Sequence, residues 1–162
     1  MMAEIKISIA AQQLTYIAEK SGVKTYPVST SLKGTGQKND SGMTPLGMHV
    51  IRAKIGHGQP LNSVFVGRRP TGEVFTPRMM SEFPGRDWIL SRILWLSGKQ
   101  PGFNRLGDVD TMRRYIYIHG TPYEDQLGEA VSHGCIRMSN LDVIDLFSRV
   151  EIGCPVYIKQ GY

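Results

Sequence analysis

The strongest constraint on the fold is that apolar residues come in short alternating stretches separated by turn residues. Ile5, Ile7 and Ile9 alternate with polar or small residues, and alternation of this kind puts every second side chain on one face of a strand. The 18 Gly and 9 Pro separate such stretches with turns and loops. A chain of 162 residues supports one packed core. We therefore expect a single, mostly β domain over residues 1–162.

Short strands are predicted along most of the chain. Four more stretches have strand-like composition: 14–18, 25–29, 48–52 and 155–159. Residues 31–44 are polar and glycine-rich without a period, which predicts an exposed loop, and residues 98–107 predict another. The apolar run 88–96 predicts a buried strand, with a short buried helix as the alternative.

One helix is predicted near the C-terminus. Ser139 or Asn140 suits its N-cap, and Asp142 lies in its first turn. Gly153 is expected to end it. Four apolar residues recur at helical spacing: Val143, Ile144, Phe147 and Val150. The expected fold class is thus mostly β with one or a few short helices.

The charge pattern argues against several classes of partner. The formal charge of +5 comes from 19 basic and 14 acidic residues, and the basic residues are scattered instead of forming the stripe that binds nucleic acid. No basic segment followed by an apolar core marks a secretory signal, and no apolar run of about 18 residues marks a membrane anchor. We expect a cytoplasmic protein if Met1 is the native start, and a periplasmic or cell-envelope protein if the chain is part of a longer one.

The reactive residues gather in one stretch, residues 118–138, "IHGTPYEDQLGEAVSHGCIRM". Two cysteines are too few for a disulfide framework, so we expect free thiols, with Cys154 as a small buried residue. Outside the stretch, His49 and His57 are interpreted as an ordinary strand residue and a loop residue. The other two histidines and Cys135 are the candidates for chemistry.

Cys135 is interpreted as a nucleophile and His119 as its base. A thiol is mostly protonated at neutral pH, so a nucleophilic cysteine needs an imidazole or a positive environment to form thiolate. The strand predicted over 114–118 delivers His119, and alternation puts Tyr117 on the same face. Glycine at 134 allows close approach of a substrate carbonyl, and the amides of Gly134 and Cys135 are candidate oxyanion donors.

Two other readings fit the same residue types. His119, His133 and Cys135 are also a possible ligand set for an open catalytic zinc site. The three residues could also form an inert structural cluster. The acidic residues of "LGDVD" at 106–110 are too few for a calcium loop, and we expect no metal and no cofactor.

The whole chain resembles the L,D-transpeptidase (YkuD) catalytic domain. The resemblance is carried by "IHG" and "SHGCIRM", with "TPLG" at 44–47 and "GCPVYI" near the end. It implies a β-sandwich-like domain that forms an acyl-enzyme on cysteine. The implied substrate is a peptidoglycan stem tetrapeptide, cleaved between the L-centre of diaminopimelate and the terminal D-alanine.

The resemblance also implies roles for individual residues. Cys135 matches the nucleophile, His119 the general base, and Gly120 the position whose carbonyl orients the imidazole. Arg137 replaces an asparagine found in many members, and by alternation it shares a face with Cys135, where it suits a substrate carboxylate; a surface arginine is the alternative. The remaining residues expected around the substrate or the oxyanion are Ser132, His133, Gly134 and Tyr117.

Three functions remain open at this point. The favoured one is an L,D-carboxypeptidase that trims stem peptides or muropeptides during cytoplasmic recycling, with water as acyl acceptor. The second is an envelope L,D-transpeptidase that joins two diaminopimelate residues in 3-3 cross-links. The third is a non-catalytic wall-binding module on the same fold. The sequence does not indicate an oligomeric state.

Overall fold

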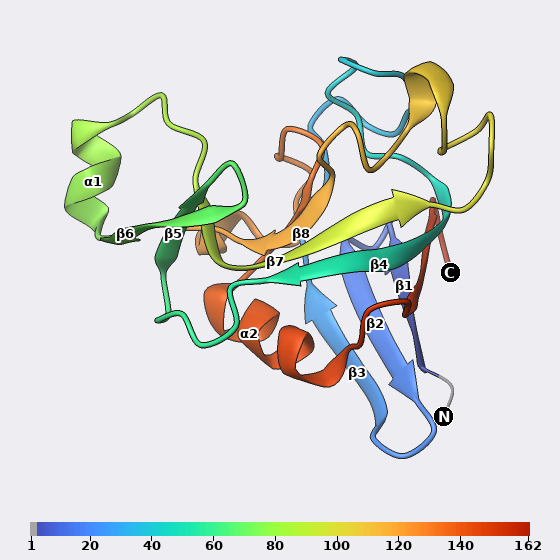
Figure 1. Ribbon diagram of the computed structural model, residues 1–162, viewed down its shortest axis with the longest axis horizontal. Helices are drawn as coiled ribbons and strands as arrows, with labels where there is room; N and C mark the ends of the chain where they lie inside the picture. Colours follow the sequence, from blue (N-terminus) through green and yellow to red (C-terminus); the bar gives the residue numbers. More distant parts are fainter. Residues whose placement is uncertain (1–2) are drawn as a thin grey trace.

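The computed structural model describes residues 3–162, in which a ten-stranded sheet is combined with two α-helices (Figure 1). Its strands are β1 (Ala3–Ser8), β2 (Gln13–Ala18), β3 (Gly22–Pro27), β4 (Gly47–Ile55), β5 (Ser63–Val66), β6 (Arg69–Val74), β7 (Ile89–Gly98), β8 (Tyr117–Gly120), β9 (Ile136–Met138) and β10 (Pro155–Lys159). The helices are α1 (Pro77–Glu82) and α2 (Asn140–Arg149), with 3-10 turns at Gly107–Val109 and Glu124–Gln126. None of the helices described is long and apolar enough to cross a lipid bilayer.

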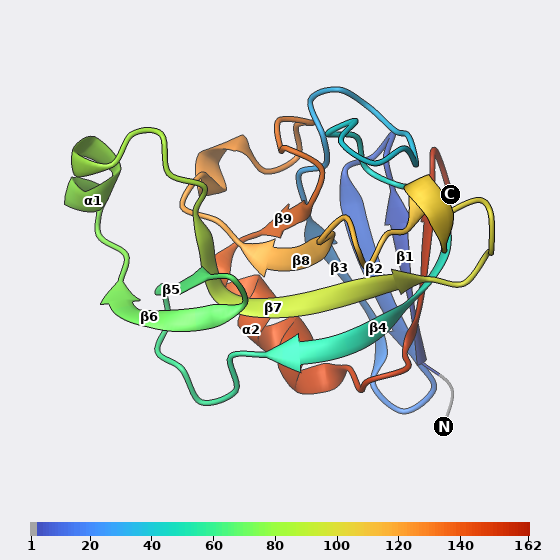
Figure 2. The ribbon, with the colours of Figure 1, turned by 45° about the horizontal axis from the view of Figure 1, so that its top comes forward.

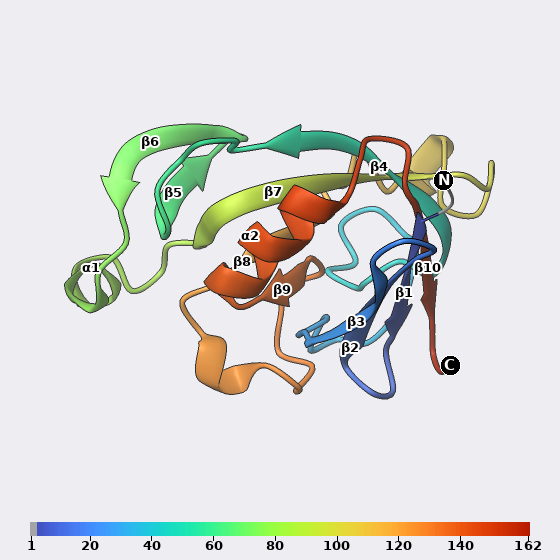
Figure 3. The same cartoon turned by 90° about the horizontal axis from the view of Figure 1, so that it is seen from below.

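The sheet is continuous and bends around α2. The strand order is β3-β2-β1-β10-β4-β7-β5-β6, with β8 paired to β7 and β9 paired to β8. Most pairs are antiparallel, whereas β1–β10 and β8–β9 are parallel. Helix α2 lies inside the bend against β7 and β8 (Figures 2 and 3). The fold is mostly β, as the sequence predicts. A single bent sheet takes the place of the two separate layers of a sandwich.

The main core fills the space between the bent sheet and α2. Alternation along β1 buries Ile5 and Ile7 completely, and the same core receives Ile118 of β8 and Ile136 of β9. A smaller apolar cluster around Trp88 lies under the lobe formed by β5, β6 and α1. The main core holds β8 and β9, and the smaller cluster supports the lobe.

The predicted strands are largely confirmed, including the buried strand over 88–96, which is β7. The strand predicted over 114–118 is wrong at its start, because β8 begins at Tyr117. Tyr115 has a left-handed backbone with φ 56, and the Arg114 guanidinium donates to Met43 O at 2.6 Å. A tertiary contact thus holds the chain in a turn where the residue types favour a strand.

The predicted helix is α2, and its N-cap is Ser139, whose hydroxyl accepts from Asp142 N at 3.1 Å. It ends earlier than expected, at Arg149, because Val150 leaves the helical conformation. Gly153 instead provides a left-handed residue, φ 95, in the turn before β10. The hairpin of β5 and β6 and the short helix α1 have no counterpart in the sequence prediction, because their residues show neither period clearly.

The core can be tested with two identical substitutions on α2. Leu146→Ala removes a side chain that is 0% exposed, and Leu141→Ala removes one that is 71% exposed. We expect Leu146→Ala to lower the free energy of unfolding by about 2–5 kcal/mol and Leu141→Ala by less than about 0.5 kcal/mol. Urea denaturation measures both, and equal losses would contradict the placement of α2.

Candidate active site

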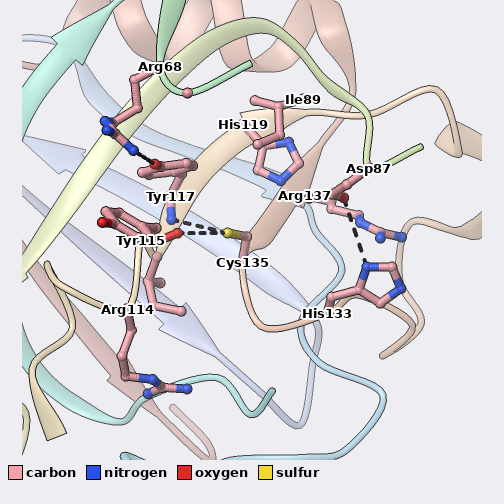
Figure 4. A pocket seen from close by; sticks show the side chains of 12 residues that line it. Arg68, Asp87, Ile89, Arg114, Tyr115, Tyr117, His119, His133, Cys135 and Arg137 are labelled. Atoms are coloured by element: carbon pink, nitrogen blue, oxygen red, sulfur yellow. Dashed lines mark hydrogen bonds and ion pairs between the residues drawn. The ribbon is translucent and has the colours of Figure 1, made fainter. Parts of the chain in front are cut away.

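The two candidate catalytic residues line one cavity of about 320 Å³ (Figure 4). Strand β8 and the turn before β9 form its floor, and the β5–β6 hairpin and the start of β7 form one wall. Its lining residues are Gly67, Arg68, Asp87, Ile89, Arg114, Tyr115, Ile116, Tyr117, His119, His133, Cys135 and Arg137.

His119 is a buried imidazole whose tautomer is fixed by the backbone. Its Nδ1 donates to the carbonyl of Gly120 at 2.7 Å, so Nε2 is left as the hydrogen-bond acceptor. Burial lowers the pKa of the imidazole, which keeps it neutral at physiological pH. His119 is therefore available as a proton acceptor.

At Gly120 there is no space for a side chain, and its carbonyl binds His119. A Cβ at this position would lie 2.7 Å from Leu90 O and even closer to Asn140 Oδ1. Asn140 is itself fixed, because its Oδ1 accepts from Ser91 Oγ at 2.6 Å. The end of β8 thus packs directly on backbone and on the first residue of α2.

Cys135 follows a tight turn held by two buried hydroxyls. Ser132 Oγ donates to Cys135 O at 2.6 Å and accepts from Gly134 N at 3.2 Å. Thr44 Oγ1 donates to Gly134 O at 2.9 Å. Gly134 has φ 129, a left-handed value that strains any residue with a Cβ. This network sets the direction in which the cysteine side chain leaves the turn.

The same network distinguishes the two expected oxyanion donors. The Gly134 amide donates to Ser132 Oγ at 3.2 Å, so it is already engaged within the turn. The Cys135 amide has no hydrogen-bond partner within residues 3–162. Of the two predicted donors, Cys135 N is the one that remains free. Ser132, predicted near the substrate, is 2% exposed and acts on the turn.

The thiol of Cys135 is half-buried, and its surroundings favour the protonated form. Its sulfur accepts from Tyr117 N at 3.3 Å, and its proton is donated to Tyr115 O at 3.4 Å. Burial raises the pKa of Cys135 to about 12, although the Tyr117 amide and the charges of Arg137 and Arg114 act in the opposite direction. Both shifts favour the uncharged forms, so we expect a thiol and a neutral imidazole at rest in place of the thiolate expected from the sequence.

Arg137 is buried against the cavity instead of lying on the surface. It is 7% exposed, and its guanidinium lies over the Tyr123 ring at 5.2 Å. Within the described residues the guanidinium has neither an ion-pair nor a hydrogen-bond partner. Its nitrogens are not fully buried and line the cavity, so a cation with free donors is available there for an anionic group of a ligand.

His133 lies at the rim of the cavity with its side chain 79% exposed. Its Nδ1 is 3.9 Å from Asp87 Oδ1, and the two side chains face each other in Figure 4. Within residues 3–162, there is no group of three or more His, Cys, Asp or Glu side chains that could hold a metal ion. The arrangement therefore lends no support to the zinc reading of His119, His133 and Cys135.

Sequence reasoning missed several residues of this site. Thr44 belongs to "TPLG", but its contact with Gly134 spans 90 positions and leaves no local signal. Arg114 donates to Gly36 O and Met43 O, so it anchors the predicted loop 31–44 beside the cavity. Arg68 belongs to a hairpin that the sequence did not predict.

Comparison with known proteins finds relatives in sequence. The family model of the YkuD L,D-transpeptidase catalytic domain matches residues 3–158. The chain is 41% identical over 65 residues to the putative L,D-transpeptidase YqjB of Bacillus subtilis, covering 40% of this chain and 35% of that protein. It is 33% identical over 116 residues to the probable L,D-transpeptidase YbiS of Escherichia coli, covering 66% and 37%. The matched part is thus little more than a third of either relative.

Solved structures show the same fold. An L,D-transpeptidase of Enterococcus faecium aligns with a TM-score of 0.59 at 14% identity, over 98% of this chain and 50% of that one. L,D-transpeptidase 3 of Mycobacterium tuberculosis aligns with a TM-score of 0.57 at 18% identity, over 97% and 60%. At these identities the similarity concerns the fold alone.

The protonation state of the thiol predicts its alkylation profile. With a Cys135 pKa of about 12, the thiolate fraction and the labelling rate should rise about tenfold per pH unit from pH 7 to 10. Iodoacetamide labelling in a Cys154→Ala background, followed by mass spectrometry, measures this rate. A plateau reached by pH 7 would show a resting thiolate and contradict the neutral pair.

The Thr44 hydroxyl should support the cysteine turn. Thr44→Val leaves Gly134 O and Ser31 N, which donates to Thr44 Oγ1 at 3.0 Å, without their buried partner, and we expect a loss of about 1–3 kcal/mol in unfolding free energy. Thr25→Val, on the exposed strand β3, is the matched control and should change stability by less than about 0.5 kcal/mol. Denaturation midpoints compare the two, and an unaffected Thr44→Val would refute the contact.

Proposed function

Because the chain belongs to the YkuD family of L,D-transpeptidase catalytic domains, we propose that it is a cysteine acyl-transfer enzyme acting on peptidoglycan stem tetrapeptides. The observation that supports this most is the shared cavity in which the Cys135 thiol, an oriented neutral His119 and an unpartnered buried Arg137 meet. A nucleophile, a base and an anion-binding group are the parts that cleavage of a carboxyl-terminal peptide bond requires.

Acyl-enzyme formation follows from this geometry. The thiol turns from Tyr115 O toward His119 Nε2, which takes its proton as the sulfur attacks the carbonyl carbon of the diaminopimelate residue. The Cys135 amide stabilises the developing oxyanion. The carbon–nitrogen bond then breaks as the imidazolium returns its proton to the leaving amine. D-alanine departs, and the diaminopimelate carbonyl remains on the Cys135 sulfur as a thioester.

Arg137 is assigned to the carboxylate of the leaving D-alanine. It lies opposite His119 in the register of β8 and β9, and His119 delivers the proton to the leaving amine. The leaving residue must therefore lie on this side of Cys135. A carboxylate there gives the guanidinium, which lines the cavity, the charged partner that it lacks within the described chain.

Water is the acceptor that the sequence interpretation favours. Attack by water on the thioester, with His119 as base, gives a tripeptide and makes the protein an L,D-carboxypeptidase of muropeptide recycling. The partial exposure of Cys135 supports access of water to the thioester.

An amine acceptor is favoured by a second hollow. A space of about 360 Å³ adjoins the first and shares Arg114, Tyr115, Ile116 and His133 with it. A second peptide entering there would meet the thioester from a different side and yield a 3-3 cross-link. The envelope transpeptidase is therefore the second candidate function. A non-catalytic wall-binding module finds less support, since such a module needs neither the thiol nor the imidazole.

The catalytic assignment predicts three distinct responses. Cys135→Ala should abolish release of D-alanine from a stem tetrapeptide, and His119→Ala should lower its rate by about 10²–10⁴. Cys154→Ala, which changes a buried thiol outside the cavity, should leave the rate largely unchanged. Full activity in Cys135→Ala would contradict the proposed mechanism.

Product analysis distinguishes the two acceptors. The protein is incubated with a disaccharide tetrapeptide, with and without an amine acceptor, and the products are identified by mass. Tripeptide as the main product at all amine concentrations supports the carboxypeptidase. Cross-linked dimer as the main product, even with water in large excess, supports the transpeptidase.

A further inference from the structure

Arg68 is one of three arginines that line the cavity, with Arg114 and Arg137, and its backbone conformation is unusual. It is the second residue of the two-residue turn between β5 and β6, since Val66 pairs with Arg69. Gly67 and Arg68 have φ 57 and φ 64, the values of a type I′ turn, in which glycine or asparagine is the favoured residue at such a position. An arginine there holds an unfavourable backbone conformation, a feature that concentrates at functional sites.

Aromatic rings fix the guanidinium of Arg68 over the cavity. Its central carbon is 4.9 Å from the ring centroids of both Trp95 and Tyr115. Tyr115 also has a left-handed backbone, φ 56. Arg68 and Tyr115 therefore both occupy a sparsely populated backbone conformation. The Arg68 side chain is thereby pre-organised and loses little freedom when it binds a ligand.

The donors of Arg68 are mostly unused. One N–H group donates to Tyr117 Oη at 3.0 Å, and a guanidinium has five such groups. Within residues 3–162 no carboxylate forms an ion pair with Arg68. A permanent cation that lines a cavity without an acidic partner is suited to an anion from outside the chain.

The position of Arg68 identifies which part of a substrate it meets. Arg68 binds Tyr117, and Arg137 pairs in register with His119; these two β8 residues are about 7 Å apart along the strand. Figure 4 shows the two guanidiniums on opposite sides of Cys135. If the leaving residue occupies the His119 side, the retained acyl residue lies on the side of Arg68.

Resting on the proposed function, we propose that Arg68 determines donor specificity by binding the carboxylate at the far end of the diaminopimelate side chain. In a stem tetrapeptide this residue forms the thioester through its L-centre, and its D-centre carries a free carboxylate. A planar fork of N–H donors matches such a carboxylate bidentately. The site would then select diaminopimelate over residues of similar length that lack this group.

Two donor peptides test this assignment. One is a tetrapeptide ending in diaminopimelate–D-alanine, and the other has lysine in place of diaminopimelate and so lacks only the carboxylate. We expect the wild type to prefer the first peptide in kcat/KM for D-alanine release. Arg68→Gln should lower kcat/KM on the diaminopimelate peptide by about 10- to 100-fold, the range for a charge-assisted hydrogen bond, and leave the lysine peptide nearly unchanged.

Two further variants separate specificity from structure. Arg69→Gln changes the exposed neighbour of Arg68 and should leave both peptides unaffected. Arg68→Gly relieves the left-handed backbone, so it should keep or raise the melting temperature while losing the same donor preference.

The failures of the two proposals are distinguishable. Equal losses on both peptides in Arg68→Gln, or a wild type without a donor preference, would overturn the Arg68 assignment while acyl transfer itself persists. Release of D-alanine from neither peptide by the wild type would overturn the proposed function, and the Arg68 assignment with it.

Discussion

The site depends on the parallel register of β8 and β9. Ile118 pairs with Ile136, and both side chains are 0% exposed in the main core. A slip by one residue would turn these isoleucines toward the cavity and the site residues toward the core, so apolar burial strongly specifies the register. With the register fixed, Cys135 lies beside Tyr117 and His119 lies beside Arg137. The hydrophobic core thereby positions the polar chemistry on the other face.

The turn before β9 adds a second level of control. Ser132 and Gly134 of this turn are buried, and unpaired buried polar groups are costly. The bonds of Ser132 and Thr44 with this turn therefore make its conformation specific. Thr44 ends the loop 31–44, and the Arg114 guanidinium holds that loop through Met43 O. The loop therefore forms part of the site architecture even though only Ser31 and Thr44 within it are buried. The distant segments 31–44, 114–120 and 132–137 form one unit.

Much of the fold could be predicted from the sequence where a single period dominates. Alternation in β1 and the helical spacing in α2 reflect burial of one face, and both predictions are confirmed. Prediction failed where tertiary contacts override local preference. Tyr115 has the residue type of a strand but lies in a turn stacked under Arg68. The hairpin of β5 and β6 exposes most of its residues, so it carries little alternation to read.

For the candidate site, the sequence indicated the reactive groups better than their environment. The residues His119 and Cys135 follow from "IHG" and "SHGC", and the Gly120 carbonyl has the orienting contact that the resemblance implies. Burial could not be read from the sequence, and burial decides the protonation states and the position of Arg137. The role of the Gly134 amide likewise depends on Ser132 Oγ, a contact that only the folded turn reveals.

The central claim is that Cys135 carries the acyl group of a stem tetrapeptide, and direct trapping of this intermediate tests it. The protein is mixed with the tetrapeptide, quenched in acid after short times, and digested for peptide mass mapping. The account predicts a transient mass increase on the peptide that contains Cys135, equal to the substrate minus D-alanine. Release of D-alanine with no adduct on Cys135, or with an adduct on another residue, would contradict the account.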